Sequence, residues 1–381
     1  PSGNAKELYQ LTPGIVLNNR YLIGTALGVG GFGITYVAWD QKLEQKVAIK
    51  EFYPSAGGIV NRSPGVANVI IYSGEKAIEF EKGKQRFLTE ARSMARFSGH
   101  PNIVHVYEYF EQNSTAYIAM EFLEGKSFKD YLKESNGPID CNIAKNVILA
   151  VLDALKEIHK AGIIHRDISP DNVFISPEGV IKVIDFGAAR YATTKHSKSL
   201  SVIIKPGYAP EEQYRSRGDQ GPHTDVYALA ATFYKMITGI TPEDAMERSV
   251  KDMLKRPSKL GIDISKPMDT AIMNALMVNI EDRTPTMEEF EEELNNAEVK
   301  ERKKTAAKDT SGSMPMPLKV SLWLGAGILS LALLAVLTIN VAPRLGIDKI
   351  LGATDVTVPN LVNQDYESIK DIDKLSIITD E

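Results

Sequence analysis

The sequence has 381 residues, which suggests about two or three domains of roughly 150 residues each. Hydrophobic residues make up 43% and charged residues 24%, a globular composition that excludes a wholly disordered or fibrous chain. The formal net charge of −5 gives no basic field, so we expect no nucleic-acid partner. The single cysteine, Cys141, excludes an internal disulfide. Because the sequence begins at Pro1 without an apolar signal peptide, we interpret it as a fragment or a processed chain.

The first part of the chain has the pattern of short β-strands. Segments rich in β-branched and aromatic residues predict strands at 21–27, 34–39, 46–52, 104–110 and 116–122. Between the third and the fourth, residues 77–97 have helical spacing, with Phe87, Ala91 and Met94 at i, i+4 and i+7. A small β-rich lobe is therefore expected.

After Gly125 the pattern becomes mainly helical. Apolar residues at helical spacing form one stripe from Ile143 to Ile158. Short strands are predicted at Val173–Ile175 and Ile181–Val183, and further helices at 225–237 and 268–278. A larger helical lobe therefore follows the β-rich one, which makes the fold class α+β.

Residues Gly28–Gly33 read G-V-G-G-F-G and match the pattern G-x-G-x-x-G. The pattern alone is weak, because dinucleotide-binding folds share it. In those folds a helix follows the glycines, whereas here Ile34–Ala38 continues as a strand. A glycine-rich hairpin lets backbone N–H groups approach phosphate oxygens without obstruction by a Cβ atom. A plain flexible turn is the alternative.

Three further clusters carry charged side chains. Val47–Lys50 reads V-A-I-K, and a lysine among apolar strand residues needs an anionic partner, for which Glu90 is the candidate. His165–Asp167 reads H-R-D and is followed by Asn172. Asp185 opens D-F-G after a strand, where its carboxylate can hold a cation. Each cluster alone is also compatible with structural residues, but their order along the chain is hard to obtain by chance.

In this order the motifs resemble those of the protein kinase family, over about residues 20–295. The resemblance implies a bilobal protein kinase fold, with ATP and Mg²⁺ or Mn²⁺ as cofactors. It also implies transfer of the γ-phosphate of ATP to Ser/Thr hydroxyls of protein substrates. We therefore assign residues 1–20 to an N-terminal extension and residues 21–298 to the kinase domain.

The resemblance also implies roles for individual residues. Lys50, paired with Glu90, would bind the α- and β-phosphates, and Asp167 would accept the proton of the substrate hydroxyl. Asn172 and Asp185 would hold the metal ion. The glycines that would cover the phosphates are Gly28, Gly30, Gly31 and Gly33. The residues that would surround the adenine are Val37, Ala48, Met120 at the gatekeeper position, Glu121, Leu123 and Phe174, with backbone groups of Glu121 to Leu123 holding the base.

Other residues would have supporting roles by the same resemblance. Met94, Val106, His165 and Phe186 would stack as the regulatory spine. Asp225 would brace the backbone of the catalytic loop. Arg283 would pair with the glutamate that closes the activation segment. The literal A-P-E ends at Glu211, but counting from Tyr208 predicts Glu212 as that glutamate.

The sequence departs from the family pattern at three places. Residues 54–73 are an insertion rich in glycine and proline, in which we predict a short hairpin around 69–72. Ser169 replaces the lysine that Ser/Thr kinases usually carry after the catalytic aspartate, and Lys205 stands at the position of their usual threonine. We hypothesise that Lys205 substitutes for the missing lysine; the alternative is a solvated Lys205 in a slower enzyme.

These departures leave three candidate functions. The first is an active Ser/Thr kinase, and the second is a membrane-anchored pseudokinase that acts as an ATP-binding scaffold. Intact Lys50, Asp167, Asn172 and Asp185 favour the first. The third is a small-molecule phosphotransferase with a kinase-like fold, but such enzymes usually lack the closing Pro-Glu present here.

Regulation by autophosphorylation is a further hypothesis. Hydroxyl residues lie between Gly187 and Gly207 at Thr193, Thr194, Ser197, Ser199 and Ser201. A phosphate on one of them could pair with Arg166 and order the segment, for example after trans-autophosphorylation in a homodimer. A plain polar loop is the alternative.

The C-terminal part predicts a membrane anchor. Val320–Val341 has 22 residues without a charge, enough for one transmembrane helix. Residues 300–319 carry six basic and two acidic groups, so the positive-inside rule places the kinase in the cytoplasm and the C-terminus outside the cell membrane. The basic linker 299–319 could also contact lipid headgroups.

Two segments resemble bacterial receptor kinases in particular. Gly207–Tyr214 is similar to the G-Y-A-P-P-E-Q-Y segment of bacterial Ser/Thr kinases. Val356–Val362 resembles the opening of a PASTA repeat, so residues 342–381 are predicted to be extracellular and to belong to a module that could bind an extracellular ligand. A stub without a particular fold is the alternative.

Overall fold

The computed structural model describes residues 9–31, 33–55, 58–135, 137–185, 190–191, 204–215 and 218–303. The chain divides into two compact units, residues 1–306 and 307–381, and all the described residues belong to the first. In the part of the chain that is described, no helix is long and apolar enough to cross a membrane. The predicted span at 320–341 and the segment after it lie outside the described residues.

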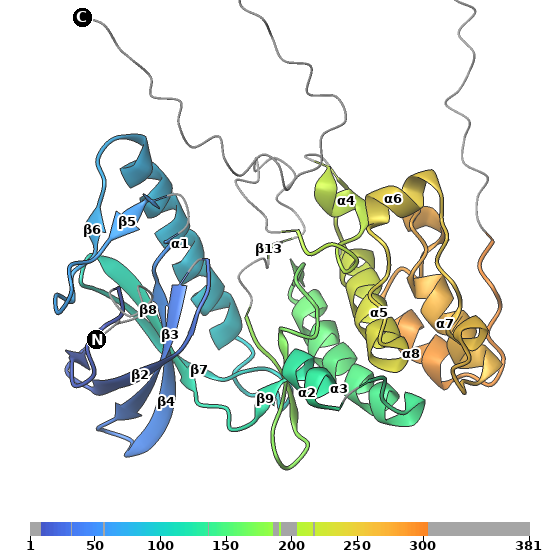
Figure 1. The fold of residues 1–381 in the computed structure, drawn as a ribbon, viewed down its shortest axis with the longest axis horizontal. Helices are drawn as coiled ribbons and strands as arrows, with labels where there is room; N and C mark the ends of the chain where they lie inside the picture. The colour runs from blue at the N-terminus through green and yellow to red at the C-terminus, as the bar shows by residue number, and fades with distance from the viewer. Residues whose placement is uncertain are drawn as a thin grey trace, which may run out of the picture. The chain divides into compact units, whose positions relative to one another are not determined.

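The N-terminal lobe is built on a six-stranded sheet with the strand order β1-β2-β3-β4-β8-β7 (Figure 1). All neighbouring strands in it are antiparallel. The strands are β1 Val16–Leu17, β2 Tyr21–Val29, β3 Gly33–Asp40, β4 Gln45–Phe52, β7 Val106–Gln112 and β8 Thr115–Glu121. The strands predicted in this lobe are therefore confirmed with small shifts of their ends, and β1 is an addition to them.

Helix α1, Glu75–Ala95, packs on this sheet against β7 and β8. The predicted helix began two residues later, at Ala77. The helix begins directly after Gly74, whose φ of 75° is a conformation that glycine adopts without strain. The buried face of α1 carries Phe80, Phe87, Ala91 and Met94.

The insertion between β4 and α1 contains a small hairpin. Strand β5, Val60–Asn61, pairs antiparallel with β6, Ile70–Ile71. The hairpin predicted around residues 69–72 therefore covers only the second strand, β6, of the observed hairpin. Both strands lie beside α1 (Figure 1).

The C-terminal lobe is mainly helical, and α3 packs against α5 and α8 in its centre. Its helices are α2 Phe128–Glu134, α3 Cys141–Lys160, α4 Glu211–Tyr214, α5 Pro222–Thr238, α6 Ala245–Val250, α7 Lys266–Ala275 and α8 Met287–Asn295. Its short strands are β9 Lys126–Ser127, β10 Ile163–Ile164, β11 Val173–Ile175, β12 Ile181–Val183 and β13 Arg190–Tyr191. The Asp140 carboxylate accepts hydrogen bonds from the first backbone N–H groups of α3, and Gly239 ends α5 in the left-handed conformation.

The last described residues lie against this lobe. The buried Asn274 side chain donates to the carbonyl of Lys300 at 3.0 Å and accepts from the backbone N–H of Arg302 at 3.0 Å. The Arg302 guanidinium pairs with Glu289 at 2.9 Å and with Glu293 at 3.1 Å. Arg302, one of the basic residues of the predicted linker, is therefore engaged by the C-terminal lobe.

Candidate active site

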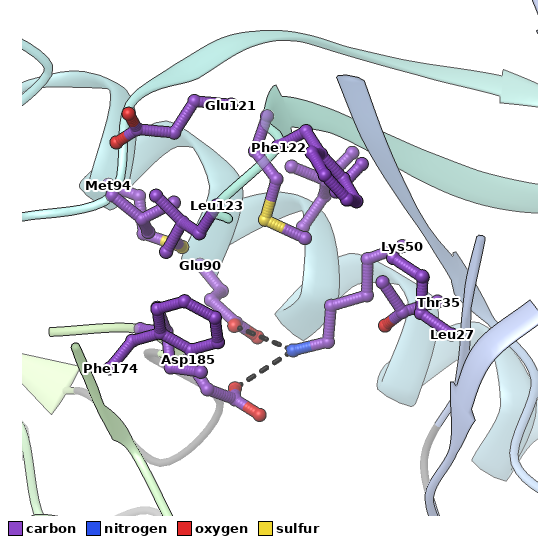
Figure 2. A pocket seen from close by; sticks show the side chains of 15 residues that line it. Leu27, Thr35, Lys50, Glu90, Met94, Glu121, Phe122, Leu123, Phe174 and Asp185 are labelled. Carbon is purple, nitrogen blue, oxygen red and sulfur yellow. Dashed lines mark hydrogen bonds and ion pairs between the residues drawn. The ribbon is translucent and has the colours of Figure 1, made fainter. Parts of the chain in front are cut away.

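A pocket opens between the sheet of the N-terminal lobe and the first strands of the C-terminal lobe. It encloses about 730 Å³ with its open mouth included, a size that is typical of small-molecule sites. Its lining is mostly apolar. Of its four charged side chains, Lys50, Glu90 and Asp185 converge at one end, and Glu121 lies apart from them (Figure 2). The apolar and hinge residues that line it are Leu27, Thr35, Ala48, Met94, Val104, Ile118, Met120, Glu121, Phe122, Leu123, Phe174 and Ile184.

Most residues expected around the adenine lie in this lining. Ala48, Met120, Glu121, Leu123 and Phe174 all contribute to it. Val37 is paired with Ala48 across β3 and β4 but is not among the lining residues. Phe122, within the expected segment Glu121 to Leu123, also lines the pocket, whereas the sequence reasoning missed Leu27, Thr35, Val104, Ile118 and Ile184. The alternation of strand side chains was a signal for two of them, because Thr35 and Ile118 are the cross-strand partners of Lys50.

The glycine-rich segment forms the turn between β2 and β3. Gly28 pairs with Thr35, and the backbone N–H of Gly30 donates to the carbonyl of Gly33 at 2.8 Å. A Cβ at Gly28 would meet no atom within 4 Å, and one at Gly30 would meet only the Gly33 carbonyl, at 3.8 Å. A Cβ at Gly33 would collide with the carbonyl oxygen of Glu51. Gly33 is thus required by packing, whereas Gly28 and Gly30 leave an open backbone.

The Lys50 ammonium lies between two carboxylates (Figure 2). Its Nζ is 3.4 Å from Glu90 Oε1 and 2.8 Å from Asp185 Oδ1, so the expected pair with Glu90 is present. Burial opposes the charge on Lys50, but Asp185 and Glu90 outweigh it and raise the pKa of the ammonium. Burial raises the pKa of the Glu90 carboxyl to about 7, against the opposing effect of Lys50. Two carboxylates share one ammonium, which leaves an excess of negative charge in the cluster.

The side chain of Asp225 in α5 fixes the backbone of the catalytic loop, the segment from His165 to Asn172. This fully buried carboxylate accepts the backbone N–H of His165 at 2.8 Å and that of Arg166 at 2.7 Å. It also contacts His159 Nε2 at 2.7 Å, a partner that sequence reasoning missed. Arg166 adopts a φ of 70°, which these hydrogen bonds hold in place. The bracing role expected of Asp225 is confirmed.

Asp167 is held on both sides of its carboxylate. Asn172 Nδ2 donates to its Oδ2 at 2.8 Å, and Lys205 Nζ lies 2.9 Å from its Oδ1. Lys205 also donates to the hydroxyl of Ser169 at 3.0 Å. Burial raises the pKa of the Asp167 carboxyl, and Lys205 opposes this shift. Lys205 and Ser169, the two positions of the site at which the sequence departs from the family pattern, are therefore in contact.

Asn172 and Asp185 provide oxygen atoms of the kind that Mg²⁺ and Mn²⁺ prefer, one amide and one carboxylate. The N–H of Ile184, the residue before Asp185, donates to the carbonyl of Asn172 at 3.0 Å, which holds the two segments side by side. The Asp185 side chain is 41% exposed, so its carboxylate is accessible. Together with the excess negative charge around Lys50, these donors fit a divalent metal ion. Among the described residues there is no cluster of three or more metal-binding side chains, so substrate oxygens would complete the coordination.

The glutamate that closes the activation segment is Glu212. Its carboxylate binds the buried Arg283 guanidinium at 2.7 Å and 3.2 Å through two separate nitrogens. Glu211 instead pairs with Arg215 on the surface. The prediction of Glu212 over Glu211 is confirmed. Of the expected regulatory spine, Met94, Val106 and His165 are buried, and Phe186 lies outside the described residues.

The family is shown by a model of the protein kinase domain, which matches residues 65–307. The chain belongs to the protein kinase family. The match begins after the glycine-rich turn and Lys50, but β2, β3 and β4, which carry them, are part of the same sheet as β7 and β8. The predicted bilobal kinase fold is confirmed for the described residues.

The chain is similar to bacterial serine/threonine-protein kinases. It is 30% identical over 314 residues to PrkC of Bacillus subtilis, an alignment that covers 79% of this chain and 45% of PrkC. It is 31% identical over 291 residues to PknB of Mycobacterium leprae, covering 73% of this chain and 43% of PknB. The solved structure of PpkA-294 in its apo form is 33% identical, with a TM-score of 0.66, and the match covers 75% of this chain and 99% of that chain.

The chain spans less than half the length of these curated relatives. The prediction of a kinase domain of the bacterial Ser/Thr type is confirmed by them.

Proposed function

We propose that the protein is an active Ser/Thr protein kinase that transfers the γ-phosphate of ATP to hydroxyl groups of protein substrates. The observation that carries the proposal is the pairing of Lys50 with Asp185 at one end of an apolar pocket, with Asp167 and its two partners on the catalytic loop. This arrangement provides charge stabilisation and positioning, which account for most of the catalysis of phosphoryl transfer.

Each charged side chain has one task in the proposed reaction. Lys50 binds phosphate oxygens and withdraws negative charge from them, and Glu90 orients its ammonium. Asp167 accepts the proton of the attacking hydroxyl, and Asn172 fixes the rotation of its carboxylate. A divalent cation held by Asn172 and Asp185, when bound, supplies further positive charge to the phosphates. The apolar lining around Met120 and Phe174 excludes water from the base.

The test is transfer of label from γ-labelled ATP to a generic protein substrate by the full chain, compared with Asp167→Asn. Transfer that this substitution reduces by about 10³-fold or more supports the proposal. ATP binding without transfer would support the pseudokinase scaffold instead. Labelling of a small molecule but not of protein would support a small-molecule phosphotransferase.

We also propose that Lys205 provides the positive charge that the family usually places at the position of Ser169. Its ammonium contacts both the Oδ1 of Asp167, at 2.9 Å, and the Ser169 hydroxyl, at 3.0 Å. A lysine at position 169 and one at position 205 would therefore place a cation at the same carboxylate from opposite sides. A cation beside the transferred phosphoryl group stabilises the charge of the transition state.

The substitution Lys205→Met should lower kcat by about 10²-fold with little change in the KM for ATP. The double substitution Ser169→Lys with Lys205→Thr should recover part of that loss. Lys156→Met is a matched control, because its ammonium also lies 2.9 Å from a carboxylate, that of Glu291, but within the C-terminal lobe. If Lys205→Met is as active as the parent, the exchange of roles is refuted.

We further propose that the kinase is anchored in the cell membrane by the segment 320–341, with the kinase domain in the cytoplasm and residues 342–381, including the PASTA-like start, outside. The uncharged run and the basic flank of the sequence support this topology. Contact of the linker with lipid and binding of an extracellular ligand belong to the same proposal. Protease added to intact cells should remove only the part after about residue 341; digestion of the kinase domain would refute the topology.

Phosphorylation of the segment between Gly187 and Gly207 is the proposed means of regulation. The hydroxyl residues of this segment, and Arg166 beside the catalytic Asp167 as a candidate phosphate partner, support it. Trans-autophosphorylation in a homodimer would be its source. Mass spectrometry of the chain after incubation with ATP should find phosphate within residues 188–206. An active enzyme without phosphate there would contradict this part of the proposal.

A further inference from the structure

A second ion pair lies inside the N-terminal lobe, away from the pocket. It joins Glu51 of β4 to Arg62 of the insertion, and both side chains are fully buried. Neither residue belongs to the machinery described above. A buried charge pair is costly to form, so its presence calls for a closer account of its surroundings.

The surroundings of Glu51 satisfy its carboxylate completely. The hydroxyls of Tyr36 and Tyr117 donate to its two oxygens, each at 2.9 Å. The Arg62 guanidinium donates to both oxygens as well and to the carbonyl of Tyr9 at 2.9 Å. Strands β3, β4 and β8, the N-terminal segment and the insertion therefore meet at one carboxylate. A buried carboxylate held by this many hydrogen bonds is rigid.

The insertion is anchored at both of its arms before α1 begins. The first arm carries Arg62. In the second arm the backbone N–H of Val69 donates to the carbonyl of Asn113, which lies in the β7–β8 turn, at 3.0 Å. The first turn of α1 is tied back to the insertion, because Lys76 Nζ donates to the carbonyl of Gly58 at 3.0 Å. The start of α1 is thus fixed to the sheet through the insertion.

The body of α1 approaches β4 closely. The ring of Phe52 packs against Phe80 and Phe87 of α1, with centroid distances of 5.2 and 5.5 Å. A Cβ at Gly83 would lie 2.7 Å from the Phe52 ring, so glycine is needed for this approach. The Phe87 ring in turn lies 5.9 Å from the Lys50 ammonium. The position of α1 along the sheet therefore decides whether Glu90 reaches Lys50.

We propose that Arg62 is a positioning residue, which holds α1 at the place where Glu90 pairs with Lys50. Three consecutive residues of β4 are engaged: Lys50 by Glu90, Glu51 by Arg62, and Phe52 by the α1 rings. The insertion thus acts as a built-in brace for the catalytic ion pair. This inference rests on the proposed kinase function, since it assigns the brace to the same site.

The test is a double-mutant cycle between the brace and Glu90. Arg62→Met combined with Glu51→Leu removes both buried charges at similar volume, so that no unpaired charge remains. In the full chain this pair of changes should lower kcat/KM by about tenfold. In the Glu90→Gln background the same pair should lower it by less than about twofold, because the brace acts through Glu90. An equal loss in both backgrounds would mean a merely structural role and would overturn the proposal.

Amide hydrogen exchange gives a readout that does not depend on activity. The double change should speed exchange in residues 75–95 and leave α3 as it is in the parent. Arg248→Met, which alters a buried arginine of the C-terminal lobe, is the matched control and should leave residues 75–95 unchanged. If the double variant does not fold, Arg62→Lys is tested instead, with and without Glu90→Gln. It keeps the positive charge but loses the two-pronged guanidinium that binds both oxygens of Glu51. An inactive parent would refute the kinase function alone, whereas unchanged exchange in α1 would refute the brace.

Discussion

Lys50 and Glu51 are consecutive residues of β4, so their side chains lie on opposite faces of the strand. Each of them forms an ion pair on its own face. The Lys50 ammonium faces the pocket, where it is shared between Glu90 at 3.4 Å and the partly exposed Asp185 at 2.8 Å. The Glu51 carboxylate faces the interior, where Arg62 and two tyrosine hydroxyls satisfy it.

Both sites join a cation to carboxylate, but the two are suited to different work. The pocket cluster has more negative than positive charge and is open to solvent at Asp185, so it can accept a cation. The interior pair has no net charge and both carboxylate oxygens of Glu51 are hydrogen-bonded, so it keeps its geometry. Surroundings rather than residue type therefore decide which pair takes part in chemistry.

The largest expected effect is on activity. Asp185→Ala should lower kcat by about 10³-fold or more, because it removes the carboxylate that fits the metal ion and contacts Lys50. Its free energy of unfolding should change by less than about 1 kcal/mol, since the site is open to water. Labelled-ATP transfer and urea denaturation measure the two quantities. Glu157→Ala, at a half-buried carboxylate of α3 that pairs with Lys160, is the control. Near-parental turnover of Asp185→Ala would remove Asp185 from the mechanism.

The second effect separates the two pairs by stability. Arg62→Met alone should lower the free energy of unfolding by about 3–5 kcal/mol, because it leaves a buried carboxylate without its countercharge. Lys50→Met should lower it by less than Arg62→Met does, because Asp185 is open to water and Glu90 can take up a proton, and it should abolish transfer. Urea denaturation of both variants checks this. Equal destabilisation by the two substitutions would show that the distinction between the pairs is wrong.

A smaller effect is expected within the interior network. Tyr117→Phe removes one hydrogen bond to the Glu51 carboxylate, which should cost about 1.5–3 kcal/mol of unfolding free energy. Tyr234→Phe, whose hydroxyl donates to the backbone carbonyl of Lys255, is the matched control and should cost about 1 kcal/mol. Thermal denaturation at constant pH would measure both. A cost for Tyr117→Phe that is no larger than the control would argue against a charged Glu51.

The last expected effect is a pH dependence rather than a change at a single pH. Burial raises the pKa of Glu90 to about 7 from its ordinary value of 4.5, so the folded state binds this proton more tightly than the unfolded state does. The contribution of Glu90 to stability is therefore complete below the unfolded pKa and is lost as the pH rises through about 7. Glu90→Gln should remove this dependence and gain stability relative to the parent between about pH 5 and 8. A constant difference over that range would contradict the raised pKa.

The residues of the pocket-facing ion pair and of the rest of the active site could be predicted from the sequence, because they occur in motifs with a fixed order. Lys50, Asp167, Asn172 and Asp185 needed only their neighbours to be recognised. Alternation along strands could also have found Thr35 and Ile118, which lie beside Lys50 in adjacent strands.

The interior ion pair was not predicted, because residues 54–73 contain the glycines and prolines of an ordinary loop. One signal was present: Val47, Ile49 and Glu51 alternate onto one face, so a carboxylate among buried positions required a partner. The sequence could not indicate that Arg62 was this partner, since a loop has no periodicity. For the same reason the contact of Lys205 with Asp167 could be hypothesised from exchanged residue types but its geometry could not.

The interior ion pair of Glu51 and Arg62 also restricts how this chain can change over evolutionary time. Losing either Glu51 or Arg62 first passes through a protein with one unpaired buried charge, a step that costs about 3–5 kcal/mol. Glu51 and the insertion should therefore be inherited or lost together. Kinases that lack a segment corresponding to 54–73 should carry an apolar residue directly after the lysine that corresponds to Lys50. Shortening this segment by engineering should succeed only when Glu51 is replaced in the same step.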